Sequence, residues 1–243
     1  ERGSVQLGKQ LVAGDVAWLA PERRGVGMVF QDYALFPHLN AWRNARFGLS
    51  RGKGDERVAW LFSLLGLEGL EQRYPHQLSG GQRQRLAMAR ALAPSPRVVL
   101  LDEPFSSLDV EVRLRLRSEL SEVLEACNAS GVIVTHEPDE ALAICDRVAV
   151  MRDGVLHQCA SPQDIVRTPA TPFVGSFVLQ RNVIPAQSIQ PDQWSCPLGD
   201  LSDQDIRMGA TTASEDNCCV LVESKDIEIV ADDGGHASIV GRE

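Results

Sequence analysis

The stretch Leu78-Ser79-Gly80-Gly81-Gln82 and the nearby stretch Val98-Val99-Leu100-Leu101-Asp102-Glu103-Pro104 decide the fold of this chain. Ser79 is a good helix N-cap, and the residues from Arg83 to Leu92 are strong helix formers. The two glycines at the start of that helix let backbone N–H groups approach a phosphate closely. The second stretch is an apolar run of strand length that ends in two adjacent acids. Open α/β sheets present metal and catalytic groups at that end of a strand, so we expect an α/β fold with phosphate chemistry.

Three further motifs lie outward from these two stretches. Ser107-Leu108-Asp109 follows the acids, His136 follows the apolar run Val132–Thr135, and Gln31 follows Val29-Phe30. Taken in the order in which they follow along the chain, the five motifs resemble the Q-loop, signature, Walker B, D-loop and switch histidine of ABC-type transport ATPases. The sequence is therefore identified as similar to the ATP-binding subunits of ABC transporters.

The resemblance implies a fold and a division into domains. It implies a P-loop-NTPase-type ABC ATPase domain over residues 1–179, with a helical subdomain inserted at 40–95. A partial, small all-β barrel is expected over 180–243, where acidic residues also outnumber basic ones.

Local patterns predict the secondary structure around the motifs. Helix caps, helix-forming runs and turn residues give most of these boundaries. We expect helices over 40–49, 55–65, 83–92, 109–126 and 173–177 and from 138 and 161, a hairpin of 147–151 with 155–158, and strands at 220–222, 227–230 and 238–240.

The resemblance also assigns roles to single residues. Asp102 and Gln31 would hold Mg²⁺, Glu103 would orient or deprotonate the attacking water, and His136 would contact the γ-phosphate of ATP. The alternatives are that Asp102 and Glu103 only cap the end of a strand and that His136 is a structural histidine. A histidine at the carboxyl end of a strand, near Asp-Glu, favours the functional interpretation.

The signature residues would act on a second subunit. Ser79, Gly80, Gly81 and Gln82 would contact the γ-phosphate of ATP held by the P-loop of a second ATPase subunit, and Asp109 would lie in the segment that links the two. The resemblance thus implies a homodimer with shared ATP sites, with ATP and Mg²⁺ as cofactors.

Residues Gly3–Gln10 match the P-loop pattern G-x-x-x-x-G-K, but Gln10 replaces the Ser or Thr that binds Mg²⁺. The alternation in Ser4–Leu7 predicts a strand, and Gly8-Lys9 predicts a turn that leads back into a second strand. We therefore expect a hairpin here and no Walker A motif in this chain. We expect a fragment of a longer protein, truncated at its N-terminus and within the barrel, that alone does not bind ATP tightly. A catalytically inactive regulatory subunit is the alternative.

Composition limits the class of protein. The net charge of −9 argues against a nucleic-acid binder. No apolar run reaches the roughly 18 residues of a membrane span. The six cysteines include no C-x-x-C pair, which fits a reducing cytoplasm, and a redox or metal role for Cys218-Cys219 is disfavoured.

The resemblance implies a peripheral protein at the cytoplasmic face of the cell membrane, bound to permease subunits and acting indirectly with a solute-binding protein. The apolar segment Tyr33–Leu39 is interpreted as the docking surface for the membrane subunit, although core packing also explains it. Two segments look most like those in the ATPases of importers for ferric iron, polyamines, sulfate or molybdate, with ferric iron favoured. They are Tyr74–Gln77 and Phe105–Asp109. A soluble ABC-type DNA-repair ATPase is disfavoured, because the segment between Gln31 and Ser79 is too short for a coiled coil and the charge is acidic.

Overall fold

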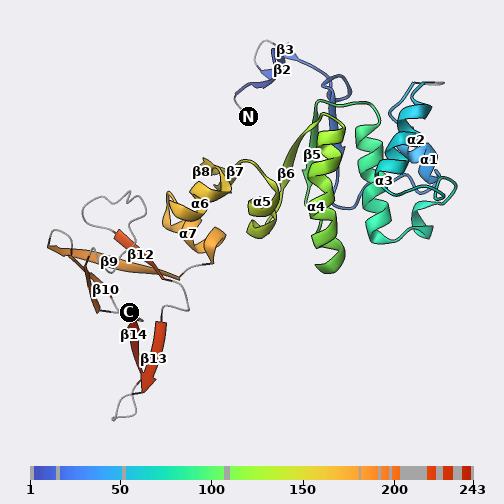
Figure 1. Ribbon diagram of the computed structural model, residues 1–243. Coiled ribbons are helices and arrows are strands. Elements are labelled where there is room, and N and C mark those ends of the chain that lie inside the picture. Colours follow the sequence, from blue (N-terminus) through green and yellow to red (C-terminus); the bar gives the residue numbers. More distant parts are fainter. Residues whose placement is uncertain are drawn as a thin grey trace. The chain divides into compact units, whose positions relative to one another are not determined.

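A parallel sheet of three strands carries the motifs in the first part of the chain (Figure 1). Its strands are β4 (Val26–Val29), β5 (Val98–Asp102) and β6 (Ser130–Val134), in the order β4-β5-β6. Met28 pairs with Leu100, and Leu100 pairs with Val132. All three strands run in the same direction, so their carboxyl ends lie at one edge of the sheet.

The computed structural model describes residues 3–14, 17–50, 53–106, 110–180, 182–190, 193–196, 199–202, 218–222, 227–231 and 237–241. The chain divides into two units, Glu1–His136 and Glu137–Glu243.

The described residues of the first unit include the α-helices α1 (Ala41–Ala45), α2 (Asp55–Leu64), α3 (Gly80–Leu92) and α4 (Val110–Ala126). Two 3₁₀ turns, η1 (Pro21–Arg23) and η2 (Pro75–Gln77), precede β4 and α3. The side chain of Asn40 accepts a hydrogen bond from the Arg43 N–H and caps α1 as predicted. The predicted end of this helix near Leu49 was wrong. The chain leaves the helix after Ala45 because the next residues close tight turns, with the Phe47 N–H donating to the Asn44 carbonyl.

Helices α3 and α4 cover one face of the sheet. Gly27 and Gly131 lie on that face, and each leaves room for a helix. A Cβ at Gly27 would lie 2.7 Å from the carbonyl oxygen of Ala91 on α3, and a Cβ at Gly131 would lie 2.7 Å from a methyl carbon of Leu124 on α4. Val29, Val99 and Leu101 are buried on the same face, so this is where the core of the unit lies.

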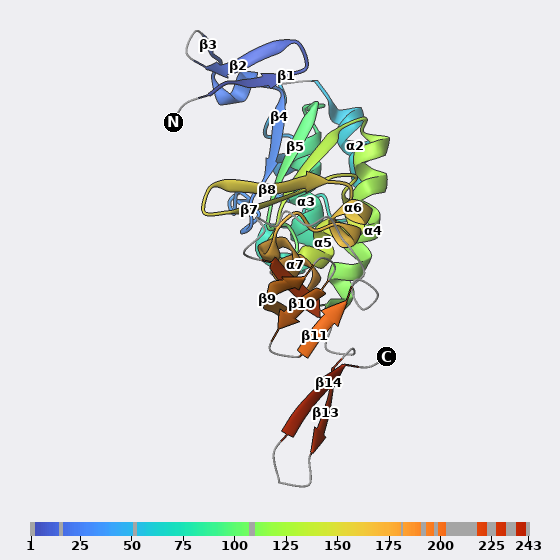
Figure 2. The same cartoon turned by 90° about the vertical axis from the view of Figure 1, so that its left-hand side faces the viewer.

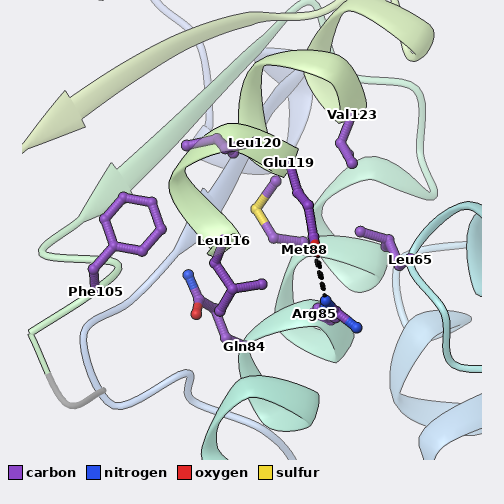
Figure 3. A pocket seen from close by; sticks show the side chains of 9 residues that line it. All are labelled: Leu65, Gln84, Arg85, Met88, Phe105, Leu116, Glu119, Leu120 and Val123. Carbon is purple, nitrogen blue, oxygen red and sulfur yellow. Dashed lines mark hydrogen bonds and ion pairs between the residues drawn. The ribbon is translucent and has the colours of Figure 1, made fainter. Parts of the chain in front are cut away.

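The seam between α3 and α4 contains a small cavity (Figure 3). Arg85 on α3 donates through Nη2 to both carboxylate oxygens of Glu119 on α4, at 2.9 and 2.7 Å. The cavity has a volume of about 20 Å³ and is lined mainly by apolar side chains. That volume is about what one water molecule needs.

The N-terminal segment folds as an antiparallel sheet of β1 (Val5–Leu7), β2 (Gln10–Gly14) and β3 (Ala17–Trp18). Leu7 pairs with Gln10 across the turn, where Gly8 has a φ of +60°. The predicted hairpin is confirmed. The stretch Gly3–Gln10 therefore does not form a P-loop, which would have to follow a strand and open a helix.

The second unit begins with a helix–hairpin–helix arrangement. Its elements are α5 (Pro138–Ile144), β7 (Val148–Arg152), β8 (Val155–Ala160), α6 (Pro162–Arg167) and α7 (Pro172–Leu179). The side chains of Ser161 and Thr171 cap α6 and α7 by accepting backbone N–H bonds. The core of this part consists of Val148, Val150, Ile165, Val174 and Val178. The hairpin and the helices match the sequence prediction.

Short strands follow α7, as predicted. They are β9 (Asn182–Gln190), β10 (Gln193–Cys196), β11 (Gly199–Ser202), β12 (Cys218–Val222), β13 (Ile227–Ala231) and β14 (Ala237–Gly241). Strands β11-β10-β9-β12 form one antiparallel sheet. Strand β13 pairs with β14 in a separate hairpin (Figure 2). A barrel and a domain boundary near residue 180 stay predictions. None of the described helices is long and apolar enough to span a membrane.

Candidate functional site

The carboxyl edge of the parallel sheet brings together three of the residues singled out in the sequence. Gln31 follows β4, Glu103 follows β5 and His136 follows β6. The strands are in register, with Val29 opposite Leu101 and Asp102 opposite Val134. The three side chains come from segments far apart in the sequence and meet because parallel strands end at the same edge.

Glu103 is the centre of this cluster. Its carboxylate oxygen Oε2 accepts a hydrogen bond from Gln31 Nε2 at 2.9 Å, and its Oε1 lies 3.1 Å from His136 Nδ1. The Glu103 side chain is 29% exposed and the His136 side chain 62% exposed, so both are accessible to a ligand. A carboxylate held by two neighbours and open to solvent can accept a proton from a water molecule.

The backbone of Glu103 is held in an uncommon conformation. Its φ is +43°, and its N–H donates to the Val134 carbonyl at 2.8 Å. The Ser106 hydroxyl donates to the Glu103 carbonyl at 3.0 Å. A non-glycine residue in the left-handed region costs roughly 1–3 kcal/mol, and such residues cluster at functional sites. These bonds keep the turn after β5 fixed and aim the carboxylate at Gln31 and His136.

Side-chain oxygen atoms of the kind that bind metal ions lie next to this cluster. Asp102 is exposed at the end of β5. Gln31 uses its amide nitrogen toward Glu103, which leaves its amide oxygen as an acceptor. The described residues contain no group of three or more His, Cys, Asp or Glu side chains that could hold a metal alone. A cation here would take further ligands from phosphate and water, which is how Mg²⁺ is commonly bound.

The signature residues form the first turn of α3. Ser79 Oγ accepts from the Gln82 N–H at 3.3 Å, and Gln82 Oε1 accepts from the Ser79 N–H at 2.9 Å, which is a capping box. Ser79 is exposed, and Gly80 and Gly81 are partly exposed. No hydrogen bond among the described residues joins this turn to Glu103. Asp109, predicted to lie in the linking segment, falls outside the described residues.

The segment after Gln31 is held by Asn44, which the sequence analysis missed. Asn44 is completely buried in α1. Its Oδ1 accepts from the Phe36 N–H at 2.9 Å, and its Nδ2 donates to the carbonyls of Phe36, Leu39 and Asn40 at 3.1, 2.9 and 3.2 Å. A signal was present, because Asn44 shares the face of α1 that buries Ala41 and Ala45.

Arg90 on α3 also holds this segment, and the sequence analysis missed it too. Its guanidinium donates to the carbonyls of Tyr33 and Ala34 and lies 5.4 Å from the centre of the Phe36 ring. Burial lowers the pKa of Arg90, and the Asp32 carboxylate opposes that shift. Nothing in the sequence distinguishes Arg90 from the other arginines of α3.

A family model described as ABC transporter matches residues 1–106 of the chain. That range includes the hairpin, Gln31, the signature turn and Glu103. Over these residues the chain is similar to the ABC transporter family.

Curated relatives of the chain are named as import ATP-binding proteins. A sulfate/thiosulfate import ATP-binding protein of Xylella fastidiosa is 49% identical over 180 residues, which is 70% of this chain and 52% of the relative. An Fe(3+) ions import ATP-binding protein of Rhizobium meliloti is 45% identical over 191 residues, which is 76% of this chain and 54% of the relative. The chain thus spans about half the length of these curated relatives.

A solved structure shows a similar ABC fold. It is cbiO1 from Clostridium perfringens, part of the ABC transporter complex cbiONQ, with a TM-score of 0.54 and 30% sequence identity. The match covers 59% of this chain and 60% of that chain. The predicted fold class, an ABC ATPase domain of α/β type, is confirmed.

Replacing Asn44 with Ala is expected to destabilise this ABC domain by about 2–4 kcal/mol, because it empties a fully buried position and removes the acceptor of the half-buried Phe36 N–H and the donor to the Leu39 carbonyl. Urea unfolding of the 243-residue chain measures the change. Asn40→Ala is the matched control, because losing a helix cap costs only about 1 kcal/mol. Equal losses in the two variants would contradict the role given to Asn44.

Proposed function

We propose that this chain is part of an ATP-hydrolysing subunit that energises the import of a solute through a membrane permease. The observation that carries the proposal is the cluster at the sheet edge, where Glu103 is held between Gln31 and His136. Hydrolysis of ATP needs a positioned water, neutralised phosphate charge and a closed site. The names of the curated relatives, which are import ATP-binding proteins, support the same function.

Each residue of the cluster has a role in the proposed reaction. Glu103 orients the attacking water and accepts its proton, because its carboxylate is accessible and fixed by two neighbours. His136 is directed by its contact with Glu103 and is exposed enough to reach the γ-phosphate. Gln31 positions the carboxylate and joins it to the segment Tyr33–Leu39, which we propose as the docking surface for the permease.

Asp102 and the amide oxygen of Gln31 would hold Mg²⁺ in this site. Both are hard oxygen ligands, and two protein ligands with phosphate and water complete the usual coordination of this ion. When bound, Mg²⁺ neutralises charge that develops on the phosphates. The protein residues contribute binding and orientation around it.

In the proposed dimer, the signature turn of one subunit contacts the ATP that the other subunit binds. The capping box leaves Ser79 exposed at a helix N-terminus, where the backbone N–H groups and the helix dipole favour an anion. No described hydrogen bond ties this turn to the Glu103 cluster of the same chain. We therefore propose that Ser79–Gln82 contact the γ-phosphate of ATP bound by the partner subunit, in a homodimer.

The complete subunit must supply a P-loop from outside these residues, since the only match to the P-loop pattern folds as a hairpin. We propose that the complete subunit is bound to permease subunits at the cytoplasmic face of the membrane and works with a solute-binding protein. The two relatives are named for sulfate/thiosulfate and for Fe(3+) ions. The solute is therefore proposed to be one of these inorganic ions, and the sequence-based choice of ferric iron stays a prediction.

Removing the metal ion is expected to stop hydrolysis by the complete subunit. Without Mg²⁺, the phosphate charge that faces the Glu103 carboxylate is not neutralised. Phosphate release is measured with Mg²⁺, after EDTA, and after Mg²⁺ is restored, and only the EDTA sample should fall to background. Hydrolysis that continues in EDTA would contradict the roles of Asp102 and Gln31. The isolated 243-residue chain, with no P-loop, serves as the inactive control.

A further inference from the structure

Helix α3 contacts the chain just beyond Gln31 through Arg90. Arg90 lies in the last turn of the helix that begins with the signature residues. Its Nη2 donates to the Tyr33 carbonyl at 2.9 Å, and its Nη1 donates to the Ala34 carbonyl. One guanidinium therefore satisfies two successive carbonyls, and its planar fork matches that task better than an ammonium would.

The backbone that Arg90 holds is strained. Tyr33 has a φ of 65° and Ala34 a φ of 45°, although neither is a glycine. Within the turn, the Asp32 carboxylate accepts from the Ala34 N–H at 3.1 Å, and the Tyr33 N–H donates to the Phe30 carbonyl at 2.9 Å. Two successive left-handed residues persist only where their surroundings hold them. The guanidinium of Arg90 on α3 supplies two of the donors that hold this turn.

We propose that Arg90 is a positioning residue for Gln31. The inference rests on the proposed function, in which Gln31 acts on the catalytic carboxylate. Gln31 lies between the strand β4 and the strained turn, so the turn sets the direction in which its side chain leaves the backbone. That direction places Gln31 Nε2 2.9 Å from Glu103 Oε2. Without Arg90 the turn relaxes, and the Gln31 amide moves away from Glu103.

The contact also joins two functional segments through one rigid element. The signature turn forms the N-terminus of α3, and Arg90 lies near the C-terminus of the same helix. A displacement of the signature turn therefore reaches the segment after Gln31 without passing through the sheet. In a dimer with shared sites, this path would connect the ATP site of the partner with the Gln31 of this chain.

The test is a double-mutant cycle in the complete subunit. Steady-state kcat and KM for ATP are measured for wild type, Gln31→Ala, Arg90→Met and the double variant. We expect Gln31→Ala to lower kcat about tenfold to a hundredfold and Arg90→Met to lower it about tenfold, because misplaced catalytic groups lose effects of this size. The double variant should show the kcat of Gln31→Ala alone, because Arg90 acts only through Gln31.

Arg85→Met is the matched control on the same helix. Arg85 binds Glu119 on α4 and makes no described hydrogen bond to the segment after Gln31. Arg85→Met should change kcat by the same factor in the wild-type subunit and in the Gln31→Ala variant. Arg90→Lys keeps the charge but loses the fork, and it replaces Arg90→Met if that variant does not fold. Thermal unfolding followed by circular dichroism identifies folded variants.

The outcomes separate the inference from the proposed function. A further drop in kcat when Arg90→Met is added to Gln31→Ala would show a general structural role and overturn the inference. Wild-type kcat in Arg90→Met or in Gln31→Ala would also overturn it. A wild-type complete subunit that hydrolyses no ATP overturns the proposed function, and this inference with it, before any variant is compared.

Discussion

ATP hydrolysis by the complete subunit is expected to fall at least about a hundredfold when Glu103 is replaced by Gln, while ATP binding persists. The substitution keeps the shape of the side chain but removes the carboxylate that accepts a proton from water. Gln31 and His136 lie within hydrogen-bond distance of this side chain, so the geometry of the cluster is largely kept. Phosphate release measures turnover, and nucleotide trapping measures bound ATP.

A matched control for this experiment is Glu125→Gln. Glu125 is exposed on α4, so the same change of charge there should leave turnover within about twofold of wild type. A Glu103→Gln subunit with near wild-type turnover would show that Glu103 is not the catalytic carboxylate. Asp102 and His136 would then be the candidates for the group that activates water.

A carboxylate at position 81 is expected to abolish the ATP site to which the signature turn contributes. Gly81→Asp places a negative charge in the first turn of α3, where the proposed ligand is the γ-phosphate. The carboxylate would repel the negatively charged phosphate, so the backbone N–H groups of the turn could no longer bind it. Gly81→Asn is the matched control, because Asn has nearly the same size without the charge and should retain more activity.

Mixed dimers show which subunit the signature turn serves. In the first dimer, one subunit carries Gly81→Asp and the other carries a disabled P-loop. If the sites are shared, both changes fall on one site and the other site still traps ATP. In the second dimer, both changes are in the same subunit, and shared sites predict trapping at neither site. The reverse pattern would overturn the role proposed for Ser79–Gln82. Trapping is measured beside turnover because coupling between the sites can silence an intact one.

Local structure was the part of this protein that the sequence predicted best. Ser79 and Asn40 cap their helices, β5 ends at Asp102, and Gly3–Gln10 forms a hairpin despite its P-loop pattern. Each of these outcomes depends on residues within one turn or one strand pair. Caps, glycine turns and apolar runs act over that distance, so their signals can be found in a single sequence.

The candidate site was predicted from an ordered set of motifs, and its geometry came from the sheet. Nothing in the intervals between Gln31, Glu103 and His136 gives the order β4-β5-β6. That order places Gln31 and His136 on opposite sides of Glu103, at 2.9 and 3.1 Å from its two oxygens. The order of strands is decided by how helices pack on the sheet, and that depends on contacts between distant residues.

The sequence by itself therefore indicated most of the elements and their caps, the resemblance to the family and the residue types at the sheet edge. Only the tertiary structure revealed the supports of that edge, Asn44 and Arg90. Arg90 donates to the backbone carbonyls of Tyr33 and Ala34, far away in the sequence, whereas Asn44 bonds to backbone atoms of the segment just before it. The left-handed Tyr33 and Ala34 carry no glycine signal either. Backbone carbonyls are the same in every residue, so the sequence does not indicate which of them a buried side chain binds.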